Sequence, residues 1–514
     1  MTPPADKATL TKNTAYSVIG YLVSYALPIF LVPYVIWRVP LADYGVWIAV
    51  SVVGMWLSRC DLGIWAAIPR EVAECRARED TQGLRTLAAT WWIFDGVVSV
   101  SILIAAVAFG KLLLPYVVPK ADEARAFPVL FLVSVQSALA PILRHQVQTL
   151  GGLQRLDLVH KMSIPVALLS AAATVLFLEL GWGIEGLAAS GAFFGVVQVP
   201  ILSMLIAGVG HPKDLSPKHF SAGVLARLIR FGWKLEAGQA ILQAFRSDRL
   251  LLMMTGFPSE RVARYQFGAA VPDRLSGFVS VLSSAILPAA TDLATRGDQE
   301  RVRFLLMRGT KYHALAAFGL LGFAALFAPE LLVLWLGRPF PDVVGVLRIL
   351  TLGFGAWAVT CCAQAIAAAL GRPGLQLAGG AAGLGLTVVL YIAVGRRYDY
   401  GHLAWAVTSG LALAQIAFMI GFRKVMAFRW REFAGNALLK PAVLALPLLA
   451  AYAAWRGLVA PQVPPVETRA QAAAVVVPAF AAVLVLGWLA ARACRVLDAV
   501  DVGALKSLGR RIPA

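Results

Sequence analysis

Hydrophobic residues fill almost the whole chain in long stretches that short polar loops separate. A stretch of about 17–25 apolar residues has the length of a helix that crosses a bilayer. Such stretches predict about fourteen membrane spans, at residues 14–37, 45–67, 89–113, 127–150, 162–180, 184–208, 231–256, 263–288, 308–334, 342–369, 375–394, 401–422, 438–456 and 470–491. Because helices satisfy their own backbone hydrogen bonds, this pattern predicts an all-α polytopic membrane protein.

The composition supports the same class. The chain is 59% hydrophobic and 14% charged, with a mean hydropathy of +0.74, which excludes a soluble globular protein of 514 residues. Its formal net charge of +18 is spread over short loops between the apolar stretches. We therefore do not expect nucleic acid as a partner.

The basic loops also predict an orientation. More of the Lys and Arg residues fall on the cytoplasmic side when the N-terminus is placed there, in agreement with the positive-inside rule. With an even number of spans, both termini are then expected in the cytoplasm. The polar N-terminus leads into a stretch that is too long for a signal-peptide core, so we expect the first span to be retained.

The sequence offers no pattern of a cofactor site. Its cysteines, Cys60, Cys75, Cys361, Cys362 and Cys494, form no C-x-x-C pair and predict neither a disulfide nor a metal site. Nucleotide-binding and zinc-hydrolase motifs are also absent. We expect no cofactor and no enzymatic activity, so an ion gradient, the membrane potential or the substrate gradient would drive any transport.

A polar connection at residues 210–229 separates six expected spans from eight. We predict an N-terminal lobe at 1–220 with spans 1 to 6, and a C-terminal lobe at 221–430 with spans 7 to 12. Residues 431–514 would add helices 13 and 14 and a cytoplasmic tail. Residues 40–47 and 258–268 each place a loop with an aromatic residue and a glycine before a span, as repeats of one bundle would.

Four arginines lie well inside expected spans, at Arg59, Arg246, Arg249 and Arg274. A buried arginine costs about 2.5–3.5 kcal/mol at the bilayer centre, so each needs a counter-ion, a cavity or a function. At about 1.5 Å of rise per residue, Arg59 lies toward the cytoplasm, Arg274 near the middle, and the other two toward the outside. Guanidinium groups bind phosphate oxygens bidentately, which favours an anionic, phosphate-bearing cargo. Ion pairing with a nearby aspartate is the structural alternative.

Four carboxylates in the spans are candidates for binding a proton or sodium ion: Asp61, Asp95, Glu236 and Asp273. Burial favours the protonated form of a carboxyl group, which makes such groups suitable for coupling. Ion pairs between helices explain them equally well, so the coupling ion stays open. The span glutamines, Gln136, Gln239, Gln243, Gln364 and Gln415, suit contacts between helices or a sugar-lined cavity. We interpret His145 and His160 as solvated residues near a loop.

Several short segments, in order, resemble Wzx-type polysaccharide flippases of the multidrug/oligosaccharidyl-lipid/polysaccharide exporter superfamily. They are Asp43-Tyr-Gly-Val-Trp47, Asp61-Leu-Gly63, Gly152-Leu-Gln-Arg-Leu-Asp157, Arg230-Phe-Gly-Trp233, Ser247-Asp-Arg249, Tyr265, Asp273-Arg274, Leu287-Pro288, Gly297-Asp298, Arg308-Gly309 and Leu334-Trp-Leu-Gly337. The resemblance covers most of the first twelve spans. It implies a multi-pass protein of the bacterial cytoplasmic (inner) membrane.

The resemblance implies that alternating access between two lobes moves an undecaprenyl-pyrophosphate-linked oligosaccharide, an O-antigen or exopolysaccharide unit, across the membrane. Arg59 and Arg274 look like cavity arginines of the related lipid II flippases and would hold the pyrophosphate, with Arg246 and Arg249 on the outward path. This chain has Arg38 only at the outer end of its first span, which argues against lipid II as the cargo. Glycosyltransferases or a glycan polymerase of the same pathway would be partners.

The nearest alternative is an ion-coupled multidrug or metabolite antiporter of the same superfamily. Its cationic substrates would favour acidic residues in the cavity, whereas this chain carries buried arginines. A membrane polymerase or ligase needs a long outer loop for its reactive groups, and the expected outer loops are short. A membrane scaffold would give the buried charges no role.

Overall fold

The computed structural model describes residues 27, 29–209, 216–394, 401–462, 464–494 and 496. It is 88% helix, and the described residues contain no strand, which confirms the all-α prediction. The chain divides into two compact units, Met1–Arg264 and Tyr265–Ala514. The division at 220 and 430 stays a prediction. The termini and most of the first expected span lie outside the described residues.

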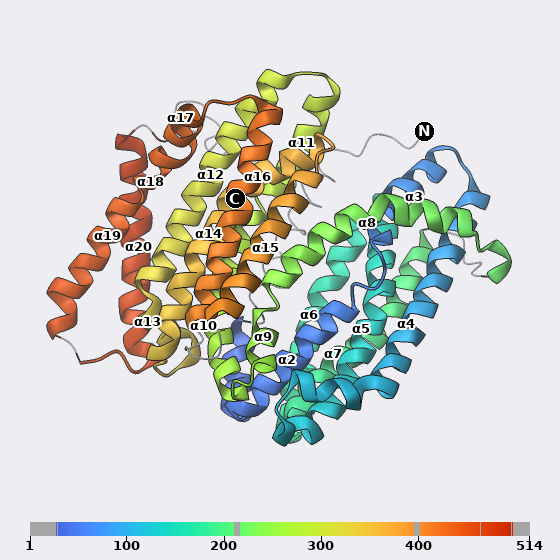
Figure 1. The fold of residues 1–514 in the computed structure, drawn as a ribbon, viewed down its shortest axis with the longest axis horizontal. Helices are drawn as coiled ribbons and strands as arrows, with labels where there is room; N and C mark the ends of the chain where they lie inside the picture. The colour runs from blue at the N-terminus through green and yellow to red at the C-terminus, as the bar shows by residue number, and fades with distance from the viewer. Residues whose placement is uncertain are drawn as a thin grey trace. The chain divides into compact units, whose positions relative to one another are not determined.

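Nine helices within the described ranges have the length and apolar composition of membrane spans, or ten if one bent pair counts as a single span. Four other expected spans fail this test or pass it only as a bent pair, because their helices are too short, too rich in charged residues or bent at a break. Those are 45–67, 231–256, 263–288 and 308–334. Figure 1 shows that long helices nevertheless dominate both units. The chain is thus a multi-pass membrane protein.

The first unit contains the helices α2 (Leu41–Leu57), α3 (Ile68–Ala77), α4 (Thr81–Val117), α5 (Glu123–Gly152), α6 (Leu156–Glu179), α7 (Gly183–Gly208), α8 (Ala222–Phe245), α9 (Asp248–Met254) and the start of α10 (Ser259–Ser280). Short 3-10 turns lie at Ile64–Ala66 (η1), Lys120–Asp122 (η2) and Pro217–His219 (η3). Helix α5 packs against α4, α6 and α7, so it lies inside the bundle (Figure 1).

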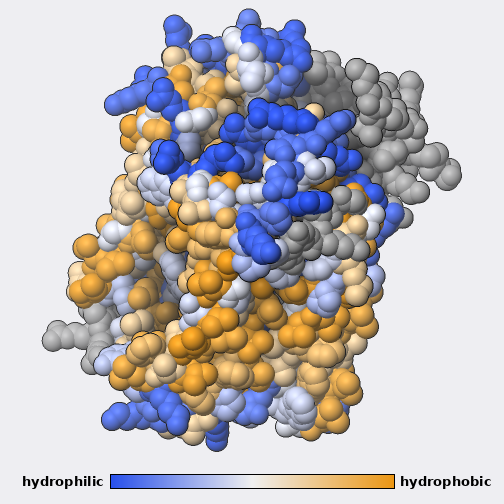
Figure 2. Space-filling view, turned by 90° about the vertical axis from the view of Figure 1, so that its right-hand side faces the viewer, coloured by the Kyte–Doolittle hydropathy of each residue, from blue (hydrophilic) through white to orange (hydrophobic). Residues whose placement is uncertain are grey.

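One face of helix α4 exposes apolar side chains, as a helix that contacts lipid does. Val97, Val100, Ile104 and Val107 are spaced by three or four residues and are all more than half exposed. That spacing places them on one face of the helix. Figure 2 shows hydrophobic side chains over the middle of one side of the molecule, with hydrophilic side chains gathered at both ends. A bilayer requires this distribution of exposed side chains.

The second unit contains the rest of α10 and the helices α11 (Ser283–Thr295), α12 (Gln299–Leu326), α13 (Ala328–Leu336), α14 (Pro341–Ala369), α15 (Gly374–Val394) and α16 (Gly401–Met426). Helices α12 and α13 are bent by 80°. Pro329, in the first turn of α13, explains the bend, because its ring excludes the backbone of a continuous helix.

The expected helices 13 and 14 close this unit. The first is a helical run, Trp430–Gln462, built from α17 (Trp430–Phe433), η5 (Ala434–Leu439), α18 (Lys440–Ala442), α19 (Ala445–Ala454), η6 (Trp455–Val459) and η7 (Ala460–Gln462). The second is α20 (Arg469–Ala493). They pack on α12 and α13 through Phe323, Phe327, Leu448 and Val476 (Figure 1).

Candidate functional site: charged side chains among the helices

Helix α2 ends inside the expected second span. Residues Ser58 to Gly63 form a turn in which Leu62 and Gly63 adopt φ angles of +54° and +80°. The Asp61 carboxylate accepts the backbone N–H of Gly63 at 3.2 Å, which stabilises the turn. The Asp61-Leu-Gly63 segment is therefore a helix-breaking turn, and we call residues 58–63 the α2 turn.

The α2 turn packs closely against α8. A Cβ atom placed on Gly232 would lie 1.9 Å from the carbonyl oxygen of Gly63, so only glycine fits here. This approach brings Arg59 to Glu236, one turn farther along α8. Arg59 Nη1 donates to Glu236 Oε1 at 2.8 Å, and Trp65 Nε1 donates to Glu236 Oε2 at 2.7 Å. Both oxygens of the Glu236 carboxylate are thus engaged.

Glu236 is the counter-ion of Arg59 in this structure. The Arg59 and Glu236 side chains are only 23% and 10% exposed. An anionic cargo that binds Arg59 must compete with this carboxylate. The role of Arg59 in cargo binding, and that of Glu236 in ion coupling, stay predictions.

Replacing Glu236 with Gln removes this counter-ion and leaves the shape of the side chain intact. We expect the free energy of unfolding to fall by about 1–3 kcal/mol, between the values for exposed and fully buried pairs. Thermal unfolding of the purified protein in detergent measures the change. The control is Glu71→Gln, which removes the partner of the largely exposed Arg227 and should cost less than about 1 kcal/mol.

A second cluster lies deeper in the same unit, and its side chains come from three elements. Arg144 Nη1 on α5 donates to Asp61 Oδ2 at 2.8 Å, and Arg144 Nη2 donates to the Ser58 carbonyl oxygen at 3.1 Å. His145 Nδ1 lies 2.6 Å from Asp95 Oδ2 on α4, and His145 Nε2 lies 3.4 Å from Asp61 Oδ2. The side chains of Asp61, Asp95 and His145 are all fully buried. We call these four residues the buried quartet.

The buried quartet corrects our interpretation of His145. This histidine is not a solvated residue near a loop but a fully buried one, because Asp95 and Trp91 on α4 and Asp61 in the α2 turn pack against its ring. The side chain of His160 lies outside the described residues. The sequence reasoning also missed Arg144. Its place about 9 Å inside the expected fourth span was the available signal.

Arg246 and Arg249 lie at the junction of α8 and α9. Arg249 is buried, and its Nη1 lies 3.4 Å from Asp248 Oδ1 and donates to the carbonyl oxygen of Arg246. Its guanidinium therefore takes part in the structure of its own junction. A position for either arginine on the cargo path stays a prediction.

Arg274 differs from the other span arginines. It lies on α10 in the second unit and is partly exposed. Among the residues that the structure describes, no hydrogen bond or ion pair reaches the Arg274 side chain. Asp273, its neighbour, has an interaction of its own. A guanidinium to which the described residues supply no counter-ion is well suited to bind an anion.

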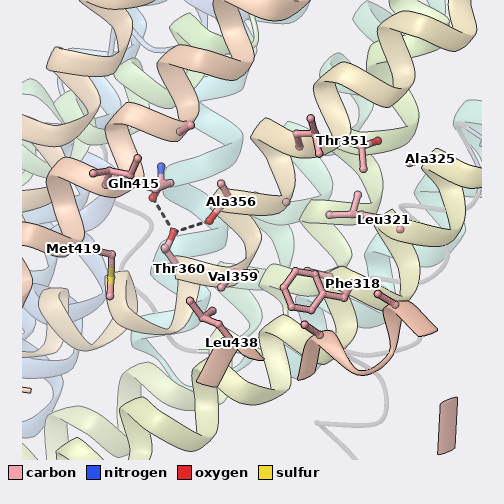
Figure 3. Close-up of a pocket in the computed structure, with 18 of the residues that line it drawn as sticks. Phe318, Leu321, Ala325, Thr351, Ala356, Val359, Thr360, Gln415, Met419 and Leu438 are labelled. Carbon is pink, nitrogen blue, oxygen red and sulfur yellow. Dashed lines mark hydrogen bonds between the residues drawn. The ribbon is translucent and has the colours of Figure 1, made fainter. Parts of the chain in front are cut away.

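Each unit contains a cavity that bears on the cargo. One of about 620 Å³ in the first unit is partly polar and is lined by Arg144, Gln136, Gln198, Ser163 and Ser170 among α5, α6 and α7. The other, of about 860 Å³ in the second unit, is almost entirely apolar (Figure 3). It is bounded by α12, α14, α16 and the run α17–α19, and we call it the apolar cavity.

Some of the span glutamines join two helices, and another lines a polar cavity, as the sequence allows. Thr360 donates to Gln415 at 2.7 Å (Figure 3), and Gln364 donates to Gln415 at 2.8 Å, so these side chains join α14 to α16. Gln136 instead lines the polar cavity of the first unit. Within the described ranges, no group of three His, Cys, Asp or Glu side chains has a geometry that could hold a metal ion.

Comparison with known proteins identifies the fold. No protein-family model and no curated protein matches the chain. The lipid II flippase MurJ in an inward closed conformation matches with a TM-score of 0.69 and 12% identity, over 93% of this chain and 99% of that chain. An inward-facing multidrug resistance MATE family transporter of the MOP superfamily matches with a TM-score of 0.60 and 14% identity, over 75% and 93%.

A further match is the MATE structure in complex with MaD3S, with a TM-score of 0.59 and 14% identity over 81% of this chain and 96% of that chain. These likenesses show that the chain has the fold of MOP-superfamily transporters. At such identities the fold is the shared property.

Proposed function

We propose that the protein is a flippase, without enzymatic activity, that moves an undecaprenyl-pyrophosphate-linked oligosaccharide across the bacterial inner membrane. The observation that carries the proposal is Arg274, a span arginine to which no described residue supplies a counter-ion. A guanidinium in this state favours a pyrophosphate, whose oxygens accept its paired hydrogen bonds. A cationic drug would be repelled by the same side chain.

The fold likeness supports transport but covers both a lipid flippase and multidrug transporters. The charge of Arg274 favours the lipid-linked anion. In the resting state, one carboxylate oxygen of Glu236 accepts from Arg59 and the other accepts from Trp65. Arg59 would bind the cargo once the cargo displaces Glu236. The proposed cargo is a Wzx-type glycan unit rather than lipid II.

The apolar cavity supports a cargo with a long hydrocarbon tail. Phe318, Leu321, Met419 and Leu438 line it, and few polar groups reach it (Figure 3). A polyprenyl chain is itself apolar and makes favourable van der Waals contacts with such a lining. We propose that part of the lipid tail occupies this cavity while the head group crosses.

Filling the apolar cavity tests the position of the tail. Gly355 lines the cavity, and a Cβ atom there would lie 3.7 Å from Leu321, so a larger side chain extends into the cavity. We expect Gly355→Phe to slow transport of the undecaprenyl-linked cargo about tenfold, which corresponds to about 1.4 kcal/mol of lost van der Waals contacts with the tail. A short-chain analogue of the cargo should move at the wild-type rate.

The control for this variant is Gly345→Phe on the same helix, where a Cβ atom meets nothing within 4 Å and the residue is exposed. Equal slowing by both variants, or equal slowing of long-chain and short-chain cargo, would place the tail elsewhere.

The test of the function is a leaflet assay with the full chain in proteoliposomes. An undecaprenyl-pyrophosphate-linked oligosaccharide is placed in one leaflet, and an impermeant glycan-modifying enzyme reports its arrival in the other. Protein-dependent movement supports the proposal. Movement of organic cations against an ion gradient, without movement of any lipid-linked sugar, would make the protein an antiporter.

A further inference from the structure

The buried quartet contains four ionisable groups whose charges balance only in one protonation state. Asp61 and Arg144 form an ion pair at 2.8 Å and neutralise each other. Asp95 and His145 are neutral as a pair when the Asp95 carboxylate is ionised and the His145 ring carries a proton on both nitrogens. Loss of one of these two ring protons leaves an uncompensated negative charge among groups that are fully buried.

We propose that the Asp95–His145 pair binds one exchangeable proton and that this proton is the coupling ion of the transport cycle. The inference rests on the proposed function because it assumes that the protein is a transporter. It adds the identity of the coupling ion, which the proposed function does not specify. It does not depend on which cargo is carried.

The geometry favours a proton over a metal cation. His145 Nδ1 and Asp95 Oδ2 lie 2.6 Å apart, which is the distance of a charge-assisted hydrogen bond. Asp95 Oδ1 is buried and has no hydrogen-bond partner among the described residues, so this carboxylate is not fully stabilised as an anion. No metal-binding cluster occurs in the part of the chain that the structure describes.

The charged groups that face His145 come from three elements. Asp95 faces it from α4, Asp61 from the α2 turn, and Arg144 precedes it on α5. The Trp91 ring covers another side, with its centroid 5.8 Å from that of the His145 ring and an angle of 79° between the two ring planes. Arg144 also lines the polar cavity of the first unit. The polar cavity therefore borders the quartet at Arg144, and we expect the exchangeable proton to reach His145 from this side.

Proton release would act on the α2 turn, which also carries Arg59. With His145 neutral and Asp95 ionised, the two carboxylates of the quartet face a single guanidinium, and their repulsion weakens the hold of Asp61 on the turn. Arg144 also binds the Ser58 carbonyl oxygen, so the same groups fix both ends of the turn. The proton content of the pair thereby sets how firmly Arg59 is positioned.

The first test needs no cargo. Nitrogen-15 NMR spectra of the histidine-labelled full chain in detergent report whether each ring carries one or two protons, and the signal lost in His145→Gln identifies His145. Between about pH 5 and 9, we expect this signal to change its proton count. In Asp95→Asn, which keeps a hydrogen-bond acceptor but removes the charge, the midpoint should shift by about one pH unit or more.

A His145 signal that keeps one proton count over the whole range, or the same midpoint in Asp95→Asn, would overturn the proposal. Failure of the leaflet assay would not, because the NMR measurement uses the protein alone. The two proposals can thus fail separately.

A second measurement keeps the test valid if His145→Gln does not fold. In proteoliposomes, an imposed pH gradient should change the initial transport rate of the wild type and have no effect in Asp95→Asn. The matched control is His313→Gln in the second unit. His313 is also buried, but its ring nitrogens contact the Ser283 hydroxyl and the Gly309 carbonyl oxygen. An Asp95→Asn variant that keeps the wild-type gradient dependence would exclude the pair as the coupling site.

Discussion

Arg274→Ala is expected to lower the rate of transport of the lipid-linked pyrophosphate about ten- to hundredfold in the leaflet assay. A hydrogen bond to a charged group contributes about 1.5–3 kcal/mol, and each 1.4 kcal/mol is a factor of ten. Because no described residue pairs with the Arg274 side chain, its loss leaves no other charge buried and unpaired. The variant should therefore fold as the wild type does.

Two further substitutions separate charge from shape at this position. Arg274→Lys keeps the charge but loses the planar pair of donors, so we expect a partial loss of rate. Arg274→Glu reverses the charge and should abolish transport. The control is Arg264→Ala on the same helix, which removes an exposed ion pair with Glu260 and should change the rate little. A fully active Arg274→Glu variant would remove this residue from the cargo site.

Hydrophobic length predicted the long helices of the bundle well. Helix α14 (Pro341–Ala369) and helix α7 (Gly183–Gly208) correspond closely to the expected spans 342–369 and 184–208. Hydropathy did not predict the broken spans, because it averages over the few residues that end a helix. The α2 turn depends on one carboxylate–amide contact and on the positive φ angles of Leu62 and Gly63. Neither feature changes the mean hydropathy of the surrounding stretch, so the break is not visible in the sequence.

Sequence reasoning identified single residues of the candidate site but not the contacts between them. Arg59 and Glu236 were both identified as buried charges, but their pairing joins positions 177 residues apart and follows from the packing of the α2 turn on α8. His145 was misjudged although the expected fourth span contained it, because the sequence does not show that Asp61 and Asp95 pack against its ring. Only the structure shows which basic side chain each carboxylate contacts.

Gly232→Ala should have the largest effect on stability of the substitutions considered. A methyl group at this position would lie 1.9 Å from the Gly63 carbonyl oxygen and 2.5 Å from its carbon, which are backbone atoms that no rotamer change can move. Helix α8 and the α2 turn must then separate. Overpacking of this kind costs about 3 kcal/mol, and separation also breaks the contacts of Glu236 with Arg59 and Trp65.

The measurement is the free energy of unfolding in detergent, followed by the change in tryptophan fluorescence. Gly223→Ala is the matched control, because Gly223 lies on the same helix and a methyl group there would be 3.8 Å from its nearest neighbour, the Ser221 hydroxyl oxygen. Alanine favours a helix over glycine by up to about 1 kcal/mol, so this control should be neutral or stabilising. If Gly232→Ala behaved in the same way, the α2 turn and α8 would have to lie farther apart than in the structure. The Arg59–Glu236 pair would then no longer be the resting state that a cargo must displace.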